Sequence, residues 1–135
     1  MAKLATEITL TAPNRPGQLA AIGKALADAG VNIAAISANA AGRDGTIRLL
    51  FANEDGAAAR RALEAAGHRI ARSGIRKVVT VSGAHRPGTL ARLAGRLAKA
   101  KVNVDSVYLA GQTRKRVTLA FGVGKDAAKA KRALA

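Results

Sequence analysis

The 135-residue chain has the length of one ordinary domain or of two very small ones. Its composition is 49% apolar, which suffices for a core, but only 2% aromatic, with Phe51, Tyr108 and Phe121 as the rings. So few rings argue against a platform that stacks single-stranded nucleic acid. The absence of cysteine excludes disulfides, zinc–thiolate centres and cysteine nucleophiles, and no apolar run reaches the roughly 18 residues of a membrane helix. Because the N-terminus also lacks a signal-peptide pattern, we expect a cytoplasmic protein without a cofactor.

Charge divides the chain into two unlike halves. The sequence holds 23 Lys and Arg against 8 Asp and Glu, a formal net charge of +15. Residues 1–67 carry seven basic and six acidic side chains, whereas residues 68–135 carry sixteen and two. Such asymmetry indicates an acidic partner for the second half, and the alternative is a basic surface that is merely solvated.

The chain contains an internal repeat with an offset of 71 residues. Arg15-Pro16-Gly17 recurs as Arg86-Pro87-Gly88, and Val31-Asn32-Ile33 recurs as Val102-Asn103-Val104. Because further matches share this offset, the repeat predicts a first unit of residues 1–74 and a second of residues 75–135, joined near Ser73-Gly74. The further matches are Leu19 with Leu90, Leu26 with Leu97, Asp55 with Asp126 and Leu63 with Leu134.

The first unit begins with alternating apolar and polar residues over 7–11, which predicts a half-buried strand. Pro16 suits a first helical turn, and Gly30 suits a left-handed stop after that helix. Strands are then expected over 31–38 and 46–52, with the turn at 42–45 between them. A second helix is expected from Asp55 as N-cap, and a short closing strand over 68–72.

The second unit repeats this order with two departures. Strands are expected over 77–82, 102–109 and 116–122, with helices after Pro87 and after Asp126. Lys101 stands where the first unit has Gly30, a poorer residue for a left-handed position. The chain also ends at Ala135 before a closing strand, which leaves a sheet edge that a partner or another segment must cover.

The element order strand–helix–strand–strand–helix–strand predicts the fold. It is the ferredoxin-like βαββαβ arrangement, in which both helices cover one face of an antiparallel sheet. The predicted class is therefore α+β, with two tandem units. Because each unit alone is small, we expect the sheets to pack side by side within the chain or between chains.

The repeated residues indicate a binding loop before the first helix of each unit. Gly17 and Gly88 allow a ligand close to the backbone, and the free amides of the first helical turn attract a carboxylate. Asn32 and Asn103 each offer an amide acceptor and donor for an ammonium group or a polar side chain. We expect the fold to bring loop and asparagine together, although a Pro-Gly turn and an asparagine bonded to its own loop explain the same residues structurally.

Asn14-Arg15-Pro16-Gly17-Gln18-Leu19 with Val31-Asn32-Ile33, and His85-Arg86-Pro87-Gly88-Thr89-Leu90 with Val102-Asn103-Val104, resemble the signature of ACT domains. The resemblance extends over nearly the whole chain, as a stand-alone tandem ACT protein. It implies a regulatory homodimer that binds a small amino acid at interfaces between units. The ligand-binding residues that it implies are Asn14, Pro16, Gly17, Gln18, Leu19, Asn32, Ile33, His85, Pro87, Gly88, Thr89, Leu90, Asn103 and Val104.

The loops depart from the family pattern at one position. The family's loop often carries Asp where this chain has Asn14 and His85. The departure weakens the expected contact with an amino group, most of all at His85. No catalytic domain accompanies the repeat in the sequence given, so the resemblance leaves the regulated target open.

Two other function classes compete with this interpretation. Catalysis is disfavoured because His68 and His85 have no nucleophile or carboxylate patterned around them and no metal-ligand spacing occurs. A nucleic-acid-associated or transcription-regulatory protein is the stronger alternative, although strand alternation turns Phe121 inward and removes it as a stacking ring. The candidate polyanion contacts are Arg92, Arg96, Lys99, Arg114, Lys115 and Arg116.

Overall fold

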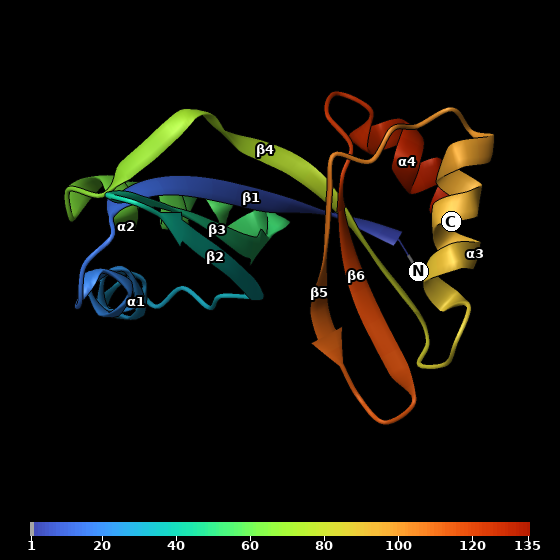
Figure 1. Ribbon diagram of the computed structural model, residues 1–135, viewed down its shortest axis with the longest axis horizontal. Coiled ribbons are helices and arrows are strands. Elements are labelled where there is room, and N and C mark those ends of the chain that lie inside the picture. The colour runs from blue at the N-terminus through green and yellow to red at the C-terminus, as the bar shows by residue number, and fades with distance from the viewer. Residues whose placement is uncertain (1) are drawn as a thin grey trace. The chain divides into compact units, whose positions relative to one another are not determined.

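The computed structural model describes residues 2–135, apart from the side chain of Ala41, and has the predicted α+β class (Figure 1). The elements follow in the order β1 (Ala2–Pro13), α1 (Gln18–Asp28), β2 (Ala35–Ala41), β3 (Asp44–Ala52), the short 3-10 helix η1 (Asn53–Asp55), α2 (Gly56–Ala65), β4 (Arg69–Ala84), α3 (Thr89–Lys99), β5 (Ser106–Gln112), β6 (Arg116–Gly122) and α4 (Ala127–Leu134). Six strands are hydrogen-bonded in the order β2-β3-β1-β4-β6-β5. Contacts divide the chain into two units, residues 6–76 and residues 2–5 with 77–135.

The unit of residues 6–76 has the predicted layered architecture. Alternate residues of β1 and β3 point to one side of their strands, where Leu10 and Leu49 are fully buried. Both helices cover this side, with Leu26 of α1 and Leu63 of α2 in the same core. The strand alternation and the helical spacing of the sequence therefore meet in one apolar layer.

The other unit repeats this layer with α3 and α4. Leu97 of α3 and Leu134 of α4 pack against Val81 of β4 and Phe121 of β6. Residues 116–122 form a strand with the predicted bounds, and Phe121 is buried as expected. The fold class of two ferredoxin-like units is thus confirmed.

The N-terminal end of β1 belongs to this second core. Ala2 is buried there, and Leu4 packs against it. In the strand order, β1 lies beside β4 on the side away from β6, the place that a fourth strand takes in such a unit. The prediction that the second unit lacks a final strand is correct for residues 75–135 alone, because residues 2–5 supply it from the start of the chain.

The junction between the repeats is a strand and not a turn. β4 runs from the closing strand of the first copy into the first strand of the second without interruption. Ser73 has a positive φ of 54° within it. A Cβ at Gly74 would lie 2.6 Å from the Ala71 carbonyl oxygen and 2.8 Å from that of Thr9, so only glycine fits this close approach.

The helix ends follow the sequence in part. Gly30 and Lys101 both have positive φ, 70° and 61°, as predicted. Pro16, in contrast, lies in the turn before α1 and not in its first turn, and the left-handed Gly17 is the N-cap residue. Asp55 and Asp126 occupy N-cap positions, but neither side chain makes a capping hydrogen bond.

Two strands begin later than predicted. β2 begins at Ala35 and β5 at Ser106, whereas the apolar residues suggested positions 31 and 102. Val31 and Val102 instead donate their amides to the helix carbonyls of Leu26 and Leu97, so they close the preceding helix. Within residues 2–135 no helix has the length and apolar character needed to span a membrane.

Candidate functional site

The loop between β1 and α1 is fastened to the hairpin of β2 and β3. The Asn14 backbone amide donates to the Arg43 carbonyl oxygen at 2.7 Å, and its side-chain Nδ2 donates to the Gly42 carbonyl oxygen at 2.9 Å. Gly17 then turns the chain into α1 with φ 91°, and a Cβ there would meet nothing within 4 Å. The backbone conformation, and not a lack of space, therefore requires glycine at this position.

A cavity of about 220 Å³ lies between this loop, α1 and the hairpin. Polar side chains of Asn14, Gln18 and Asn39 line it together with the apolar Leu19 and Ile47. The first intrahelical bond of α1 runs from the Ala21 amide to the Gly17 carbonyl. The amides that precede it lack an intrahelical partner, and a glycine N-cap has no side chain to satisfy them. The remaining lining residues are Ala12, Pro13, Arg15, Ala38, Ala40 and Gly45.

The equivalent loop of the other unit has the same backbone and different side chains. Gly88 has φ 94°, and the His85 amide donates to the Lys115 carbonyl oxygen at 2.9 Å. Thr89, however, is buried and donates its hydroxyl to the Ala84 carbonyl oxygen. Its side chain therefore serves the fold, whereas Gln18 at the matching position lines a cavity.

Asn32 and Asn103 do not join these loops within their own units. Each follows the C-terminal end of the helix whose N-terminal end carries the loop. A helix of 11 residues is about 16 Å long, so the expectation of one shared site is wrong within a unit. Both asparagines are exposed, as is Ile33, whereas Val104 packs partly against the core.

Asn39 is the lining residue that the sequence did not single out. It pairs with Thr46 across the hairpin of β2 and β3, whose turn contacts the Asn14 loop. The repeat gave no signal, because the residue 71 positions later is Ala110. The hairpin turn at 42–45 was predicted, but its approach to the loop is a tertiary contact.

The candidate polyanion contacts fall into two groups. Arg92, Arg96 and Lys99 are exposed on α3, whereas its Leu93 and Leu97 are buried. The other three stand at the turn of β5 and β6, where all are exposed. They are Arg114, Lys115 and Arg116.

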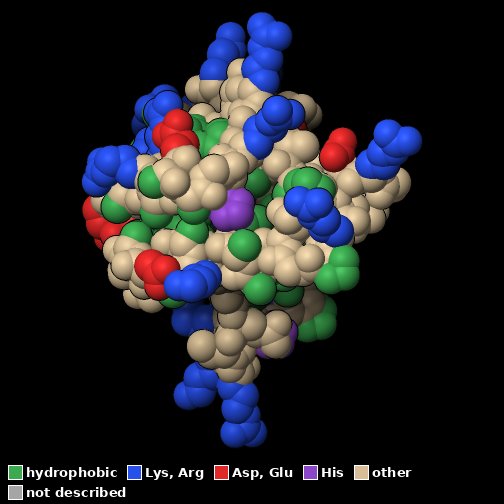
Figure 2. Space-filling view, turned by 90° about the vertical axis from the view of Figure 1, so that its left-hand side faces the viewer, with side chains coloured by type: hydrophobic (Ala, Val, Ile, Leu, Met, Phe, Trp, Pro, Cys, Tyr) green, Lys and Arg blue, Asp and Glu red, His purple; other side chains and the backbone are tan. Residues whose placement is uncertain are grey.

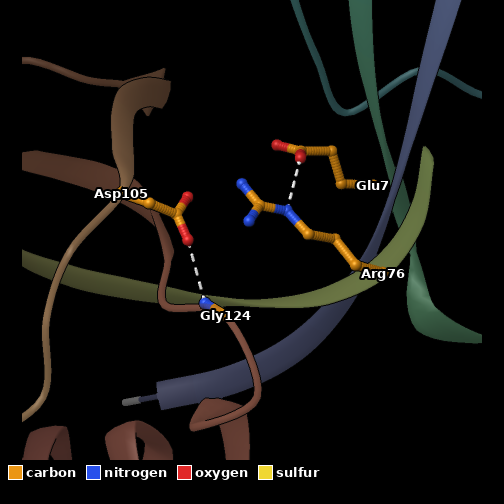
Figure 3. A network of polar contacts seen from close by, with 4 residues as sticks. All are labelled: Glu7, Arg76, Asp105 and Gly124. Carbon is orange, nitrogen blue, oxygen red and sulfur yellow. Dashed lines mark hydrogen bonds and ion pairs between the residues drawn. The ribbon is translucent and has the colours of Figure 1, made fainter. Parts of the chain in front are cut away.

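Two polar contacts outside the cavity have structural roles (Figure 3). Arg76 Nε donates to Glu7 Oε1 at 2.9 Å, and the Glu7 side chain is only 1% exposed. In the other unit, the Gly124 amide donates to Asp105 Oδ2 at 2.9 Å. No group of three or more His, Cys, Asp or Glu side chains in residues 2–135 is arranged to hold a metal ion.

The residues that form this loop, helix and hairpin match the model of a known family. The model of the ACT domain family matches residues 6–67. By this match, the first unit is similar to an ACT domain. The match supports a regulatory, small-molecule-binding role for the unit of residues 6–76. Curated protein sequences gave no significant match.

Solved structures share the fold along nearly the whole chain. Protein BT0572 from Bacteroides thetaiotaomicron is 22% identical, with 98% of this chain and 88% of the other covered and a TM-score of 0.83. The regulatory subunit of aspartate kinase from Thermus thermophilus is 20% identical, with 98% and 93% covered and a TM-score of 0.71. A putative C-terminal regulatory domain of aspartate kinase from Porphyromonas gingivalis is 16% identical, with 99% and 91% covered and a TM-score of 0.59. Both kinase titles name a regulatory part of the enzyme.

Proposed function

We propose that the chain is a regulatory protein that binds a small amino acid in the cavity beside Gln18. The observation that supports this most directly is the cavity of about 220 Å³ at the N-terminal end of α1, within the matched ACT domain. It is smaller than the roughly 300–1,000 Å³ of sites for drug-sized molecules, which favours a smaller ligand.

The ligand carboxylate binds at the first turn of α1. The amides there lack intrahelical partners, and the helix dipole favours a negative charge at this end. Arg15 lines the same cavity and adds a positive charge. These groups make the cavity a site for an anion, as helix N-terminal ends commonly are.

The ligand amino group and side chain face the hairpin. Asn14 Nδ2 donates to the Gly42 carbonyl oxygen, and Oδ1 of the same side chain is an acceptor for an ammonium group. Leu19 and Ile47 provide an apolar wall for a short aliphatic side chain. Because Asn14 is neutral where the family often has Asp, we expect modest affinity.

We assign the ligand to the first unit in preference to the second. Thr89 turns its hydroxyl to the Ala84 carbonyl, and His85 replaces the Asn14 amide. His85 lacks the amide carbonyl oxygen with which Asn14 can accept from an ammonium group, so the second loop is the weaker site.

A thermal-shift screen of the purified chain against the common amino acids tests this function. A ligand at about one hundred times its dissociation constant stabilises by about 2.7 kcal/mol, or roughly several degrees in Tm. The test variant is Leu19→Ala, which removes part of the apolar wall of the cavity. The Leu19 side chain is 54% exposed, so we expect its truncation to leave the fold intact. The control is Leu90→Ala at the matching loop position, where the side chain is 51% exposed.

We expect a shift with one or two amino acids that Leu19→Ala reduces and Leu90→Ala leaves unchanged. A flat screen, or equal effects of both variants, would remove the loop cavity as the ligand site. Substitutions of Gly17 are poor probes, because its φ of 91° would strain any other residue whether or not a ligand binds.

A further inference from the structure

The helices α3 and α4 carry an exposed set of basic side chains, the cationic helix layer. The two helices pack beside each other within one unit (Figure 1). All six cations are exposed, and no carboxylate pairs with any of them in the described part of the chain. The layer consists of Arg92, Arg96, Lys99, Lys129, Lys131 and Arg132.

The matching helices of the other unit show that the fold does not require this charge. In α1 and α2, Lys24 pairs with Asp28 at 2.8 Å and Arg60 with Glu64 at 2.9 Å. The Asp28 partner also raises the pKa of Lys24 through their hydrogen bond. The repeat offset converts Asp28 to Lys99 and Glu64 to Ala135, so both pairing acids are absent from the second copy.

The whole units differ in the same direction. Residues 6–76 carry nine basic and six acidic side chains, whereas residues 2–5 with 77–135 carry fourteen and two. On the face that Figure 2 presents, acidic and basic side chains are interspersed. The two units therefore share one fold, but the second carries a much larger net positive charge. The electric field of such a charge attracts polyanions.

Stabilisation of the helices does not explain the layer. Cations in a last turn interact favourably with the helix dipole, and α3 and α4 have such cations. However, α1 and α2 have none in their last turns and form helices of similar length.

Part of the layer borders a cleft. Arg96 and Lys99 flank a hollow of about 340 Å³ whose other lining residues are Ala100, Ala133 and Ala135. Because the alanine side chains are short, a phosphate backbone can approach the hollow beside the two long cations. This arrangement suits a chain of phosphate groups.

We propose that the cationic helix layer binds the phosphate backbone of double-stranded nucleic acid without reading its sequence. Lys and Arg side chains supply such affinity by releasing counterions from the duplex. A lipid surface fits less well, because Leu93, Leu97 and Leu134 are buried and Leu90 is the one exposed large apolar side chain on the described helices α3 and α4. A single strand fits less well because neither helix carries an aromatic ring.

Fluorescence anisotropy of a labelled DNA duplex, measured with the full chain from about 50 to 200 mM KCl, tests this inference. The test variant is R92Q/R96Q/K99Q, and the matched control is K24Q/R60Q/R61Q on the helices of the other unit. Both lose three cations, so the net charge of the two proteins is the same. Because all six side chains are exposed, we expect both variants to keep the circular dichroism of the parent.

We expect the parent to bind duplexes of unrelated sequence equally and with a steep salt dependence. The α3 variant should reduce the slope of log affinity against log salt by about 3, close to one per lost phosphate contact. The control should retain the parent slope, and R92K/R96K, which keeps the charges, should retain most of the affinity.

Three results would overturn the inference. One is no binding by the parent at about 100 mM KCl, where a backbone contact of this size should persist. Another is an equal loss in both triple variants, which would mean that net charge alone is sensed. The third is tight, α3-dependent binding of poly-glutamate without binding of the duplex, which would assign the layer to an acidic protein.

Discussion

Lys101 is a residue that the backbone makes unfavourable. It has φ 61° after α3, where the matching residue after α1 is Gly30 with φ 70°. In both places the next amide bonds to the same helix carbonyl, that of Leu97 or Leu26. A left-handed conformation costs a residue with a side chain roughly 1–2 kcal/mol. Glycine avoids this cost but loses more backbone entropy on folding, so its net advantage is smaller.

We therefore expect Lys101→Gly to raise the free energy of unfolding by about 0.5–1 kcal/mol. Urea denaturation measures it. Gly30→Ala is the reverse experiment and should lower stability by about 1 kcal/mol, because its Cβ meets nothing within 4 Å and only the conformation changes. A loss of stability in Lys101→Gly would contradict the strain argument.

In the Glu7–Arg76 ion pair, the carboxylate of Glu7 is buried and the Arg76 side chain is partly exposed. Glu7 is fully buried, and its carboxylate accepts from Arg76 Nε at 2.9 Å. Arg76→Met should lower stability by about 3 kcal/mol, because a buried carboxylate then loses a charged donor. Equilibrium unfolding measures this loss, with Arg60→Met as the control.

The control breaks an exposed pair with Glu64 and should cost less than about 0.5 kcal/mol. The double variant Glu7→Leu/Arg76→Met should recover most of the lost stability, because it removes the buried charge together with its partner. A small effect of Arg76→Met, comparable with that of the control, would show that Glu7 does not depend on this arginine.

At the scale of elements, the N-terminal strand is the piece that completes the second unit. Leu4 packs against the core of α3, α4 and β6. Leu4→Asp should therefore accelerate amide exchange in β6 and α4 more than in α1 and β3, with a loss of about 2 kcal/mol for the apolar contact.

Hydrogen-exchange mass spectrometry measures this difference segment by segment. Lys3→Asp introduces the same carboxylate at the neighbouring, exposed position and should leave the exchange pattern unchanged. Equal acceleration in both units after Leu4→Asp would show that β1 does not serve the second core in particular.

The repeat explains why most elements were predictable from the sequence and why the role of residues 2–5 was not. Residues 116–122 combine strand alternation with a sharp turn before them, and their predicted bounds are correct. Residues 2–5 are too few to show alternation, and none of them is identical to the residue 71 positions later. Their role depends on which core has an open edge, a property of the folded chain.

The candidate site was predictable to a similar extent. Asn14, Gln18 and Leu19 line the cavity because local sequence fixes the loop and helix start. Asn32 was wrongly expected beside the loop, because the 11 residues of α1 separate the loop before the helix from the asparagine after it. Asn39 was missed because its proximity arises from the packing of a hairpin against a loop.

At the scale of the molecule, both ends of the strand order are open edges. β2 and β5 are the outermost strands, and they expose Ile36, Val107 and Leu109. Exposed edges with apolar side chains favour pairing with another chain. We therefore propose that two copies associate through such an edge as a homodimer.

Ile36→Lys should weaken self-association about tenfold or more, since about 1.4 kcal/mol corresponds to a factor of ten. Ile36 lies on the edge strand β2 and is 47% exposed. Sedimentation equilibrium measures the dimer dissociation constant. Leu90→Lys is the control, with an equally apolar side chain that is 51% exposed but lies at the start of α3 and not on a strand edge. Equal dissociation constants for the two variants would assign the contact elsewhere.

A regulatory protein of this size has to convert binding into a change that a target can sense. The cavity of the first unit is formed by a loop and a hairpin, and the hairpin includes the edge strand β2. A ligand that orders the hairpin therefore affects the edge, and it shifts the equilibrium between monomer and dimer only by its difference in affinity for the two. Because such coupling is reciprocal, dimerisation must strengthen ligand binding by the same factor.

We expect the amino acid that raises Tm to lower the dimer dissociation constant by about 5- to 150-fold, the usual range of allosteric coupling. Sedimentation with and without ligand measures one side of the cycle, and calorimetric titration at protein concentrations below and above the dimer dissociation constant measures the other. Both factors should agree, and Leu19→Ala should abolish both while leaving dimerisation without ligand intact. Binding with an unchanged dimer constant would leave a ligand site that does not signal through assembly, and the signal would then have to reach a partner through the loop itself.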